Sequence, residues 1–383
     1  MKILVLNSGS SSLKFQLFAI HSLEINKCQL LFSGLVEQIG TSPINNHQHA
    51  LEKMIQQLKE KQYITALSDL SGIGHRVVHG GEAFSNPVII NEQVMETIEA
   101  LSPLAPLHNP ANLMGIKLAR QKAPQVPQVA VFDTAFHQSI PESAYIYALP
   151  YSLYQQHQVR RYGFHGTSHH YVAKQASIYL NKPLSELKLI SIHLGNGTSA
   201  SAIKNAQSID TSMGMTPLEG LVMGTRSGDI DPAILFYLNR EIGMSIDELD
   251  TLLNKQSGLK GICGENDMRQ IIKQAEQGDH KAELAIHIFC YHIKKYIGAY
   301  LATLNGADAI IFTGGIGENS ALIRHLSCQD LENLGIQIDT KKNQQKNIKA
   351  IMSIQHDSSP IKVLVIATNE ELEIAEQTIQ LLS

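Results

Sequence analysis

The sequence predicts an α/β fold with two similar domains, and three observations carry this prediction. The chain has 383 residues, which is longer than one ordinary hydrophobic core, so two domains are expected. Apolar runs typical of buried strands alternate along the chain with segments of helical periodicity. An apolar strand that ends in a turn of small residues occurs twice, at residues 2–14 and at residues 188–199.

The two copies of this strand-and-turn unit align without a gap. Placing Gly9 on Gly195 aligns the two strands, and residues 10–12 then fall on residues 196–198. A single copy is more simply explained as an ordinary polar β-turn. Two aligned copies predict a duplicated fold whose halves close on one nucleotide from both sides.

The small residues of these turns suit an anionic ligand. Glycine, serine and threonine let backbone N–H groups approach a phosphate closely, while Lys14 adds a mobile positive charge. Neither turn is a Walker A loop, because the pattern G-x-x-x-x-G-K-[ST] does not occur in the sequence. No strand is followed by G-x-G-x-x-G, so a dinucleotide-binding fold gains no support.

Composition argues against several other classes of protein. Hydrophobic residues make up 43% of the chain and charged residues 17%, as in globular proteins. The net charge of −4 argues against a nucleic-acid partner held by bulk charge. The cysteines are scattered without C-x-x-C spacing, which argues against a disulfide scaffold. No apolar run reaches membrane-spanning length and no signal peptide is recognisable, so we expect a cytoplasmic protein without a membrane partner.

Hydrophobic periodicity sets the elements expected in the first half. Continuous apolar runs or apolar–polar alternation predict strands, whereas apolar residues three and four apart predict helices. The expected strands are residues 2–7, 13–19, 31–36, 73–79 and 126–132. The expected helices are residues 50–61, 91–101 and 110–120.

The same patterns continue after a crossing segment at residues 150–162. Strands are expected from Lys188, at residues 309–312 and at residues 362–367, and helices at residues 168–180, 231–239, 245–253 and 281–304. Glycine-rich loops are expected at residues 163–168, 213–226 and 313–320. Thr368 and Glu371 match a capping box, which predicts a last helix beginning there. We therefore expect a first domain of residues 1–149 with the helix 369–383, and a second domain of residues 150–368.

Several multi-residue motifs follow one another along the chain. They are Asn7-Ser-Gly-Ser-Ser-Ser-Leu-Lys14, Gly74-His-Arg-Val-Val-His-Gly-Gly81, Leu107-His-Asn-Pro110, Val131-Phe-Asp-Thr-Ala-Phe-His137, Tyr162-Gly-Phe-His-Gly-Thr-Ser-His169, Gly220-Leu-Val-Met-Gly-Thr-Arg-Ser-Gly-Asp229 and Phe312-Thr-Gly-Gly-Ile-Gly-Glu-Asn319. Together they resemble the acetokinase family of the actin-like acetate and sugar kinase/heat-shock ATPase superfamily. The resemblance covers essentially the whole chain.

The resemblance implies both a fold and a reaction. The fold would be a duplicated ribonuclease H-like, actin-like ATPase fold with a cleft between its two domains. The reaction would transfer the γ-phosphoryl group of ATP directly and reversibly to acetate, giving ADP and acetyl phosphate. Mg²⁺ or Mn²⁺ would assist, and the protein would be a homodimer.

Two arginines carry the chemistry expected at the acceptor. Arg76 lies in an apolar strand and Arg226 in a glycine-rich loop near Asp229, so a paired core arginine and a weak surface ion pair are the plain alternatives. A guanidinium can hold a carboxylate or a phosphate through two parallel hydrogen bonds. The resemblance implies that both arginines hold the substrate carboxylate and the migrating phosphoryl group.

The resemblance also implies a catalytic histidine. His165, with Arg226, would stabilise the transition state by donating to phosphoryl oxygens, and His108 has a weaker case for the same site. His165 and His169 have the spacing of a zinc pair, but Gly166 between them disfavours a helix and no H-E-x-x-H occurs. A zinc site is therefore rejected.

Oxygen ligands for the nucleotide-bound metal are expected at the ends of predicted strands. Asp133 ends one strand, where α/β folds place chemistry, although a turn or helix cap is the plain alternative. By resemblance Asp133 is catalytic, and it supports the metal-bound phosphates together with Asn7 and Glu370. Water would mediate these contacts, because Mg²⁺ keeps much of its hydration.

The resemblance assigns two further groups of residues. The nucleotide would be bound by Ser12, Lys14, His193, Gly195, Asn196, Gly197, Asp267, Met268, Arg269, Gly314, Gly315, Ile316, Gly317 and Asn319. Met268 stands where such families often have an aromatic residue, and its thioether can pack on the purine face. The alkyl group of the substrate would be lined by Val78, Leu107, Phe164 and Pro217, for which an ordinary core role is the alternative.

Two other functions stay open at this point. A kinase for propionate or another short-chain carboxylate would use the same pocket, because one methylene is worth only about 1–3 kcal/mol there. A non-transferring, ATP-switched chaperone or filament protein would use the same fold. Such a protein would not need two arginines for an anionic acceptor. An ionised acetate, in turn, needs no general base, in contrast to a sugar hydroxyl.

Overall fold

The computed structural model describes residues 1–20, 28–345 and 351–383, which form two compact units. The first unit comprises Met1–Gln138, Gly166–Ser168 and Asn369–Ser383, and the second comprises Ser139–His165 and His169–Thr368. Residues 139–149, which we expected in the first domain, pack with the second unit. In the described part of the chain, no helix is both long and apolar enough to cross a membrane.

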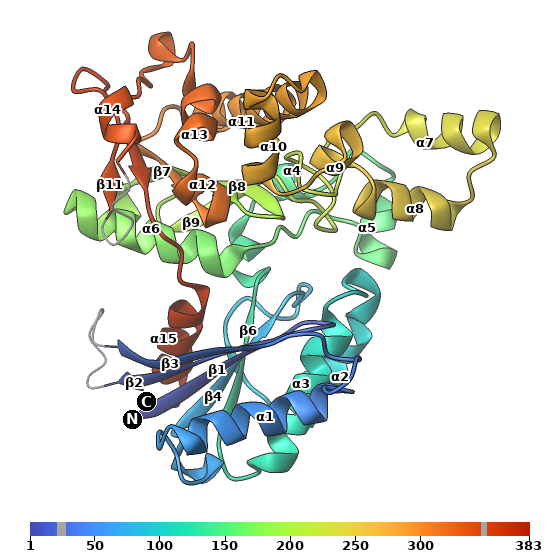
Figure 1. Cartoon of the computed structure of the whole chain (residues 1–383), viewed down its shortest axis with the longest axis vertical. Helices are drawn as coiled ribbons and strands as arrows, with labels where there is room; N and C mark the ends of the chain where they lie inside the picture. The colour runs from blue at the N-terminus through green and yellow to red at the C-terminus, as the bar shows by residue number, and fades with distance from the viewer. Residues whose placement is uncertain (21–27, 346–350) are drawn as a thin grey trace. The chain divides into compact units, whose positions relative to one another are not determined.

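The first unit is built on a mixed sheet of six strands in the order β3-β2-β1-β4-β6-β5 (Figure 1). The strand β1 pairs antiparallel with β2 and parallel with β4, which in turn pairs parallel with β6. The bounds are β1 Lys2–Ser8, β2 Leu13–Ile20, β3 Cys28–Val36, β4 Gly72–Val77, β5 Val88–Ile89 and β6 Gln128–Phe132. The carboxyl ends of β1, β4 and β6 therefore lie at one edge of the sheet.

The second unit repeats this sheet, in the order β11-β12-β10-β7-β8-β9. Its first strand, β7, pairs antiparallel with β8 and parallel with β10, as β1 does with β2 and β4. Even the register agrees, since Ile3 pairs with Gly72 and Leu189 with Ala309. The bounds are β7 Lys188–Leu194, β8 Thr198–Lys204, β9 Gln207–Thr211, β10 Ala309–Thr313, β11 Met352–Ser353 and β12 Lys362–Val365. The predicted duplication is confirmed.

The turns that follow β1 and β7 differ in length by one residue. Because β2 begins at Leu13 and β8 at Thr198, the first turn holds residues 9–12 and the second residues 195–197. In each turn the N–H of the first glycine donates to a carbonyl of the same turn, at 2.8 Å and 3.0 Å respectively. The expected alignment is therefore wrong at its last position, because Thr198 already belongs to β8.

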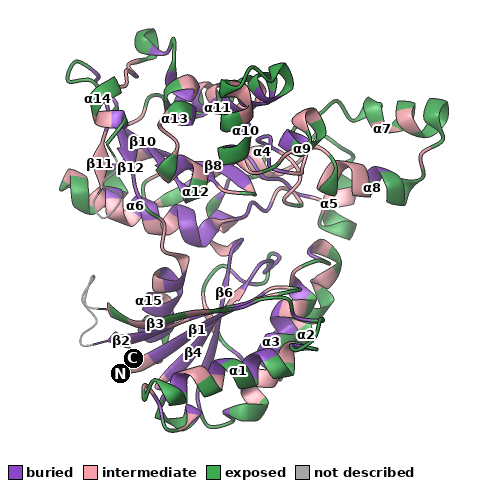
Figure 2. Cartoon of the chain, viewed as in Figure 1, coloured by how far each residue is buried: buried purple, intermediate pink, exposed green. Residues whose placement is uncertain are grey.

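Helices cover both faces of the first sheet. Successive residues of β1 point to opposite faces, so Leu4 and Leu6 pack in one apolar cluster with α1, while Ile3 and Val5 pack in another with α15. The strands β1, β4 and β6 of this sheet are largely buried (Figure 2). The helix bounds are α1 His47–Glu60, α2 Glu92–Ala100, α3 Asn109–Lys122 and α15 Glu370–Leu382.

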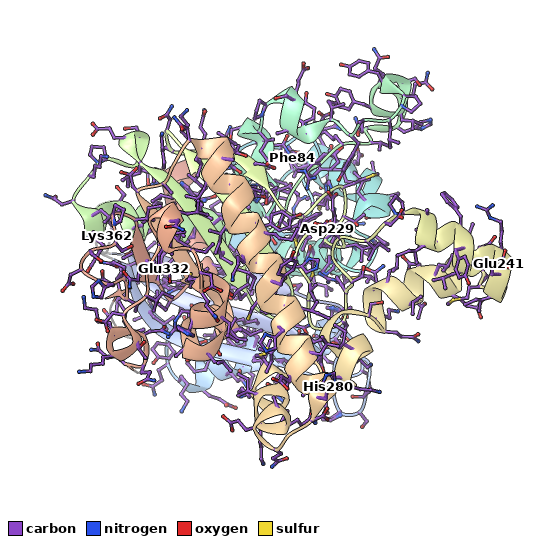
Figure 3. All side chains as sticks on the ribbon, turned by 90° about the horizontal axis from the view of Figure 1, so that it is seen from above. Phe84, Asp229, Glu241, His280, Glu332 and Lys362 are labelled. Carbon is purple, nitrogen blue, oxygen red and sulfur yellow. The ribbon has the colours of Figure 1, made fainter. Side chains whose placement is uncertain are left out.

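The second unit has its largest apolar cluster between its sheet and the long helix α11, which starts at His280 (Figure 3). The helices α9, α10 and α13 pack on α11. The other bounds are α4 Glu142–Tyr145, α5 Tyr151–His157, α6 Gly166–Leu180, α7 Ala233–Tyr237, α8 Ile246–Lys255, α9 Gly258–Cys263, α10 Met268–Glu276, α11 His280–Leu304, α12 Gly314–Asn319, α13 Ala321–Cys328 and α14 Thr340–Asn343.

Two local expectations are wrong. Residues 314–319, expected in a loop, form the short helix α12. The N-cap of α15 is Asn369 and not Thr368, and the Asn369 side chain accepts a hydrogen bond from the N–H of Leu372 at 3.0 Å. Glu371 takes no part in a capping box. Its carboxylate pairs with Lys14 Nζ at 2.6 Å and so ties α15 to β2.

Candidate active site

The first unit places an arginine beside an aspartate at the carboxyl ends of two neighbouring parallel strands. Arg76 lies in β4, and Asp133 directly follows β6. The Arg76 Nε donates to Asp133 Oδ1 and Oδ2, both at 3.1 Å, and Nη2 donates to Oδ2 at 2.6 Å. This two-pronged pairing fixes the plane of the guanidinium.

The charges around this pair keep the arginine protonated. Burial alone would lower the pKa of Arg76, but the carboxylates of Asp133 and Glu370 outweigh it, and the net pKa is raised. For Asp133 burial raises the pKa, and the charge of Arg76 offsets part of that effect. Among the described residues nothing is hydrogen-bonded to Arg76 Nη1. The guanidinium therefore keeps donors for a further anion.

The first turn of α6 supports the aspartate. Thr167 Oγ1 donates to Asp133 Oδ1 at 3.3 Å, and the N–H of Gly166 donates to the Asp133 carbonyl at 2.8 Å. A side chain at Gly166 would collide with that carbonyl oxygen and lie 3.0 Å from Phe136. Glycine is therefore required here by a close backbone approach. The expectation that Gly166 disfavours a helix is wrong, because α6 begins at this residue.

The oxygen donors expected near a metal lie in the same unit. Asn7 faces Lys14 across the β1–β2 pairing, Ser12 ends the intervening turn, and Glu370 opens α15. Glu370 Oε2 lies 3.7 Å from Arg76 Nε. No group of three histidine, cysteine or acidic side chains that could hold a metal is found in residues 1–20, 28–345 and 351–383. This sparse donor set suits Mg²⁺ carried on nucleotide phosphates, which needs only one or two protein oxygens.

The residues expected around the substrate alkyl group are divided between the units. Val78 is buried in the first unit, where its N–H donates to Asn112 Oδ1 at 3.1 Å, whereas Leu107 is 56% exposed. Phe164 is buried and Pro217 half-buried in the second unit. The weaker candidate His108 is the N-cap residue of α3.

In the second unit, three proposed phosphate-binding elements meet around one point. A Cβ atom at Gly197 would lie 3.4 Å from His165 Cε1 and 3.5 Å from both His165 Nε2 and Arg226 Nη1. The turn 195–197, the imidazole edge carrying Nε2 and the guanidinium therefore converge. Glycine leaves the space between these groups open, where a Cβ atom would be in van der Waals contact with both side chains.

The charge of Arg226 is not balanced by an acid. Its Nη1 donates to the Pro217 carbonyl at 3.1 Å and lies 3.7 Å from Met223 Sδ. Within the part of the chain that the structure describes, no carboxylate pairs with it, and burial lowers its pKa. A half-buried cation without a counter-charge is costly, and an anionic ligand would relieve that cost.

A chain of hydrogen bonds reaches His165 from the interior of the second unit. His165 Nδ1 contacts Ser199 Oγ at 2.9 Å, Ser199 Oγ contacts His169 Nε2 at 2.8 Å, and His169 Nδ1 contacts Ser191 Oγ at 2.9 Å. The last three side chains are fully buried. The His165 ring also stacks on His193, with centroids 4.4 Å apart.

This chain can hold His165 as a donor. If neutral His165 carries its proton on Nε2, its Nδ1 accepts from the Ser199 hydroxyl, which in turn accepts from His169 Nε2. Every member then has a partner, and the Nε2 proton faces the turn 195–197. His165 itself has a left-handed backbone with φ of 56°, a strained conformation for a residue with a side chain.

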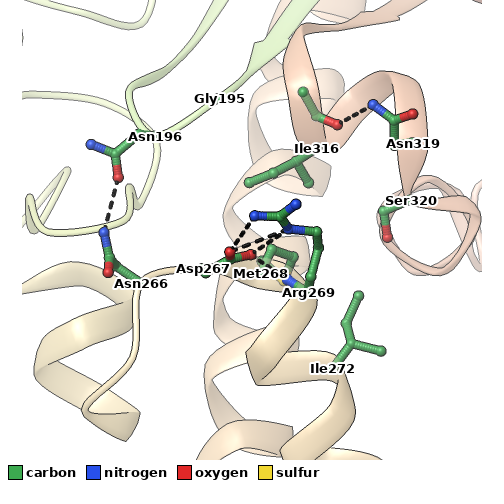
Figure 4. Close-up of a pocket in the computed structure, with 11 residues that line it drawn as sticks. Gly195, Asn196, Asn266, Asp267, Met268, Arg269, Ile272, Ile316, Asn319 and Ser320 are labelled. Atoms are coloured by element: carbon green, nitrogen blue, oxygen red, sulfur yellow. Dashed lines mark hydrogen bonds and ion pairs between the residues drawn. The ribbon is translucent and has the colours of Figure 1, made fainter. Parts of the chain in front are cut away.

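A pocket of about 790 Å³ lies beside this turn within the second unit (Figure 4). Asp267 caps α10 and pairs with Arg269, whose Nη2 lies 2.6 Å from Asp267 Oδ2. Met268 is buried and supplies an apolar wall. The pocket is lined by Gly195, Asn196, Asn266, Asp267, Met268, Arg269, Ile272, Gly315, Ile316, Asn319 and Ser320. Its size and apolar walls suit a nucleoside.

The opposite wall of the pocket, α12, is fixed by residues that the sequence did not single out. Gly314 has φ of +75°, and a Cβ there would lie 2.8 Å from the Leu194 carbonyl oxygen. Glu318 Oε1 accepts from the N–H groups of Gly314 at 2.9 Å and Thr368 at 3.1 Å. The buried Arg324 donates to the carbonyls of Gly317 and Glu318, both at 2.9 Å.

Most expected site residues thus fall into two groups, one in each unit. The first unit carries Asn7, Ser12, Lys14, Arg76, Val78, Leu107, Asp133 and Glu370. The second carries Phe164, His165, His193, Gly195, Asn196, Gly197, Pro217, Arg226, Asp267, Met268, Arg269, Gly314, Gly315, Ile316, Gly317 and Asn319. Ser199 and Glu318 lie inside segments that the sequence marks, but no role was predicted for them, and Arg324 lies outside those segments. No local pattern marks a residue that acts by holding another.

Two sheets of one topology, each with a glycine turn after its first strand, and a nucleoside-sized pocket beside one turn define an actin-like ATPase fold of the phosphotransferase class. Comparison with known proteins refines this class. The model of the acetokinase family matches residues 2–376. The chain belongs to the acetokinase family.

Relatives match over their full length. The acetate kinase of Sulfurovum sp. is 53% identical over 389 residues, which cover 99% of this chain and 98% of that protein. The crystal structure of Porphyromonas gingivalis acetate kinase is 43% identical, covers 100% of both chains and has a TM-score of 0.93. A propionate kinase structure from Francisella tularensis is 46% identical, covers 99% of both chains and has a TM-score of 0.92.

Proposed function

We propose that this chain catalyses the reversible transfer of the γ-phosphoryl group of ATP to acetate, giving ADP and acetyl phosphate. One observation carries the proposal: Gly197, His165 and the unbalanced Arg226 converge on a point beside a nucleoside-sized pocket. Acetate kinases of about half identical sequence support it.

The proposed mechanism needs positioning and charge, and little else. The pocket holds adenosine, and the N–H groups of Asn196 and Gly197 hold the phosphates, because the Gly195 N–H already donates to the Gly197 carbonyl. The γ-phosphoryl group then meets Arg226 and His165 Nε2, which neutralise charge on its oxygens as it moves. Acetate is already ionised, so that no general base is required.

The acceptor is assigned to the first unit. The free Nη1 donors of Arg76 hold the acetate carboxylate, while Asp133 fixes the guanidinium from the other side. The carboxylate oxygen has to attack in line with the leaving ADP.

The proposal includes a divalent cation, Mg²⁺ or Mn²⁺, bound with the nucleotide. Asn7 and Glu370 would hold it through water, and when bound it neutralises phosphate charge. A homodimer and a cytoplasmic location complete the proposal. Sedimentation of the purified protein tests the dimer.

A trapping assay tests the reaction. The protein is incubated with ATP, Mg²⁺ and hydroxylamine, with and without acetate. We expect acetyl hydroxamate and ADP to form together, and only when acetate is present. If ATP is hydrolysed at the same rate with and without acetate and no hydroxamate forms, the result would support the alternative of an ATPase switch.

A second candidate substrate is propionate, favoured by the similar fold of the Francisella tularensis propionate kinase. The comparison to make is kcat/KM for acetate, propionate and butyrate. One methylene changes binding by about 1–3 kcal/mol, so a preference of roughly tenfold or more for propionate would reassign the substrate within the same reaction class.

A further inference from the structure

One arginine outside the proposed catalytic set joins the two segments that carry His165 and Arg226. Arg161 precedes His165 in the chain, and its side chain is only 16% exposed. Its Nη1 lies 3.0, 3.1 and 3.2 Å from the successive carbonyls of residues 211–213, where β9 leads into the glycine-rich loop. Its Nη2 donates to Glu219 Oε1 at 2.5 Å, in the middle of that loop.

Tyr147 makes a second contact with Glu219, and we call Arg161, Glu219 and Tyr147 together the clamp. The Tyr147 hydroxyl donates to Glu219 Oε2 and accepts from the N–H of Met215 at 3.0 Å. Both carboxylate oxygens are therefore engaged, one by Arg161 and one by Tyr147. Gly214 lies beneath them, and a side chain there would collide with the Glu219 carboxylate and the Tyr147 hydroxyl.

Single hydrogen bonds connect the clamped loop with Arg226 and with the segment just before His165. Pro217 lies in the clamped loop, and its carbonyl accepts the hydrogen bond from Arg226 Nη1 at 3.1 Å. The Gly214 carbonyl accepts from the N–H groups of Tyr162 at 3.0 Å and Gly163 at 3.2 Å, just ahead of His165. A shift of the loop would therefore move the guanidinium relative to the imidazole.

Hydrogen bonds also join the two ends of the segment that carries Arg226, Gly220 and Asp229. The N–H of Gly220 donates to Asp229 Oδ1 at 2.8 Å, and the N–H of Asp229 returns a bond of 2.8 Å to the Gly220 carbonyl. Tyr296 of α11 donates to Asp229 Oδ2 at 2.7 Å, and Figure 3 labels Asp229 close to this helix. The clamp holds the part of the loop that precedes Gly220.

We propose that Arg161, Glu219 and Tyr147 are positioning residues for phosphoryl transfer, holding Pro217 and, through its carbonyl, Arg226 where His165 donates. The inference deepens the proposed function and rests on it for its kinetic part. Arginine is required because its planar fork serves several carbonyls and a carboxylate at once, which the single ammonium of lysine cannot do.

Three variants test the clamp by kinetics: Glu219→Gln, Tyr147→Phe and Arg161→Lys. Misplacement of a catalytic group by about 1 Å can cost roughly 100-fold, so we expect kcat/KM for acetate to fall by about 10- to 100-fold. The KM for ATP should stay unchanged, because no clamp residue lines the nucleotide pocket. The matched control is Asp308→Asn, which removes a carboxylate paired with Lys182 at 3.3 Å elsewhere in the same unit.

Hydrogen exchange supplies a readout that does not depend on acetate. In the variants, amides of residues 211–229 should exchange faster while the free energy of global unfolding stays close to that of the parent protein. Parent-like kinetics and exchange in the variants would overturn the clamp. So would equal losses toward ATP and acetate together with a lower free energy of unfolding, which indicate a merely structural role. A parent protein inactive toward acetate, with exchange changed as expected, would overturn the proposed function and leave the clamp standing.

Discussion

The two candidate guanidinium groups differ in what surrounds them. Arg76 donates through both Nε and Nη2 to the carboxylate of the buried Asp133. Its charge is therefore largely balanced before any substrate binds. Arg226 contacts only a carbonyl and a thioether among the described residues. We expect Arg76 to orient the acceptor and Arg226 to supply most of the charge that stabilises the transition state.

Replacement of Arg226 by alanine should therefore affect turnover and not nucleotide binding. Loss of one group aimed at developing charge costs about 10²- to 10³-fold in kcat, and Arg226 does not line the nucleotide pocket. Steady-state kinetics and calorimetric binding of ADP measure the two effects. Arg240→Ala, at an exposed position of the same unit, is the control. Unchanged turnover would remove Arg226 from the mechanism.

A buried histidine of the first unit should make stability depend on pH. His75 is 2% exposed and donates from Nε2 to Gln128 Oε1 at 2.7 Å. Burial lowers its pKa from 6.5 to about 4. Between pH 6.5 and about pH 4, His75 is therefore protonated in the unfolded chain but neutral in the folded chain. The free energy of unfolding is highest above pH 6.5 and falls as the pH is lowered toward 4.

The loss should amount to about 3 kcal/mol, at 1.36 kcal/mol for each pKa unit. Urea unfolding of the parent protein and of His75→Gln between about pH 7 and about pH 4 measures it. The difference between the two curves should shrink as the pH falls. The exposed His157→Gln variant should follow the parent protein at every pH. Parallel curves for His75→Gln would contradict the prediction.

At the scale of elements, α15 covers one face of the first sheet. Ile374 is fully buried and packs in one cluster with Ile3 and Val5 of β1. Its approach explains Gly74 in the neighbouring strand β4, since a Cβ atom there would lie 2.8 Å from Ile374 Cγ2. The segment that forms α15 is thus part of the first unit's core.

Truncation of Ile374 to alanine should destabilise the first unit. Deleting a fully buried isoleucine side chain costs about 2–5 kcal/mol, because a cavity remains in the closely packed core. Urea unfolding followed by hydrogen exchange in β1 and β4 measures this. Leu381→Ala in the same helix, at a position 40% exposed, should change little. Equal effects of the two changes would refute the assigned packing.

The elements show what a sequence can and cannot predict. The strands β1 and β7 are predicted because their apolar runs are continuous. Asp133 is marked by its place directly after a strand, whereas Arg76 lies inside one and is marked by the family resemblance. The length of the turn 195–197 was not predicted, since one residue more or less leaves the local composition unchanged. Helix α12 was taken for a loop because glycine disfavours helices, and bonds from Glu318 and Arg324 outweigh that preference.

The residues that hold others in place were beyond sequence reasoning altogether. Arg161 and Glu219 are distant in sequence, and neither lies in a pattern that marks a partner. The same holds for Ser199, which links two histidines. Their roles follow from tertiary contacts, which periodicity and motif spacing do not encode.

At the scale of the whole molecule, the duplicated units have different roles. All residues that line the nucleoside-sized pocket belong to the second unit. Arg76, Asp133 and Glu370 belong to the first. The proposed nucleoside pocket thus lies on one copy of the sheet and the proposed acceptor site on the other.

This division predicts an unequal response to a nucleotide without β- and γ-phosphates. A ligand at about 100 times its Kd stabilises the part that binds it by about 2.7 kcal/mol. Saturating AMP should therefore slow amide exchange in α10 and α12 and leave β1 and β4 unaffected. Mass spectrometry of exchanged peptides measures both regions, and ADP provides the comparison. Equal protection of the first unit by AMP would contradict the assignment.

The membership of α15 in the first unit bears on how the protein is made. Ribosomes deliver β1 early and α15 hundreds of residues later, yet the apolar underside of that strand is covered only when the helix arrives. The second unit can assemble meanwhile, because its two segments, 139–165 and 169–368, are separated by only three residues. During synthesis the second unit should thus fold before the first unit is complete. Chaperones should then bind nascent chains in which one face of β1 is still uncovered.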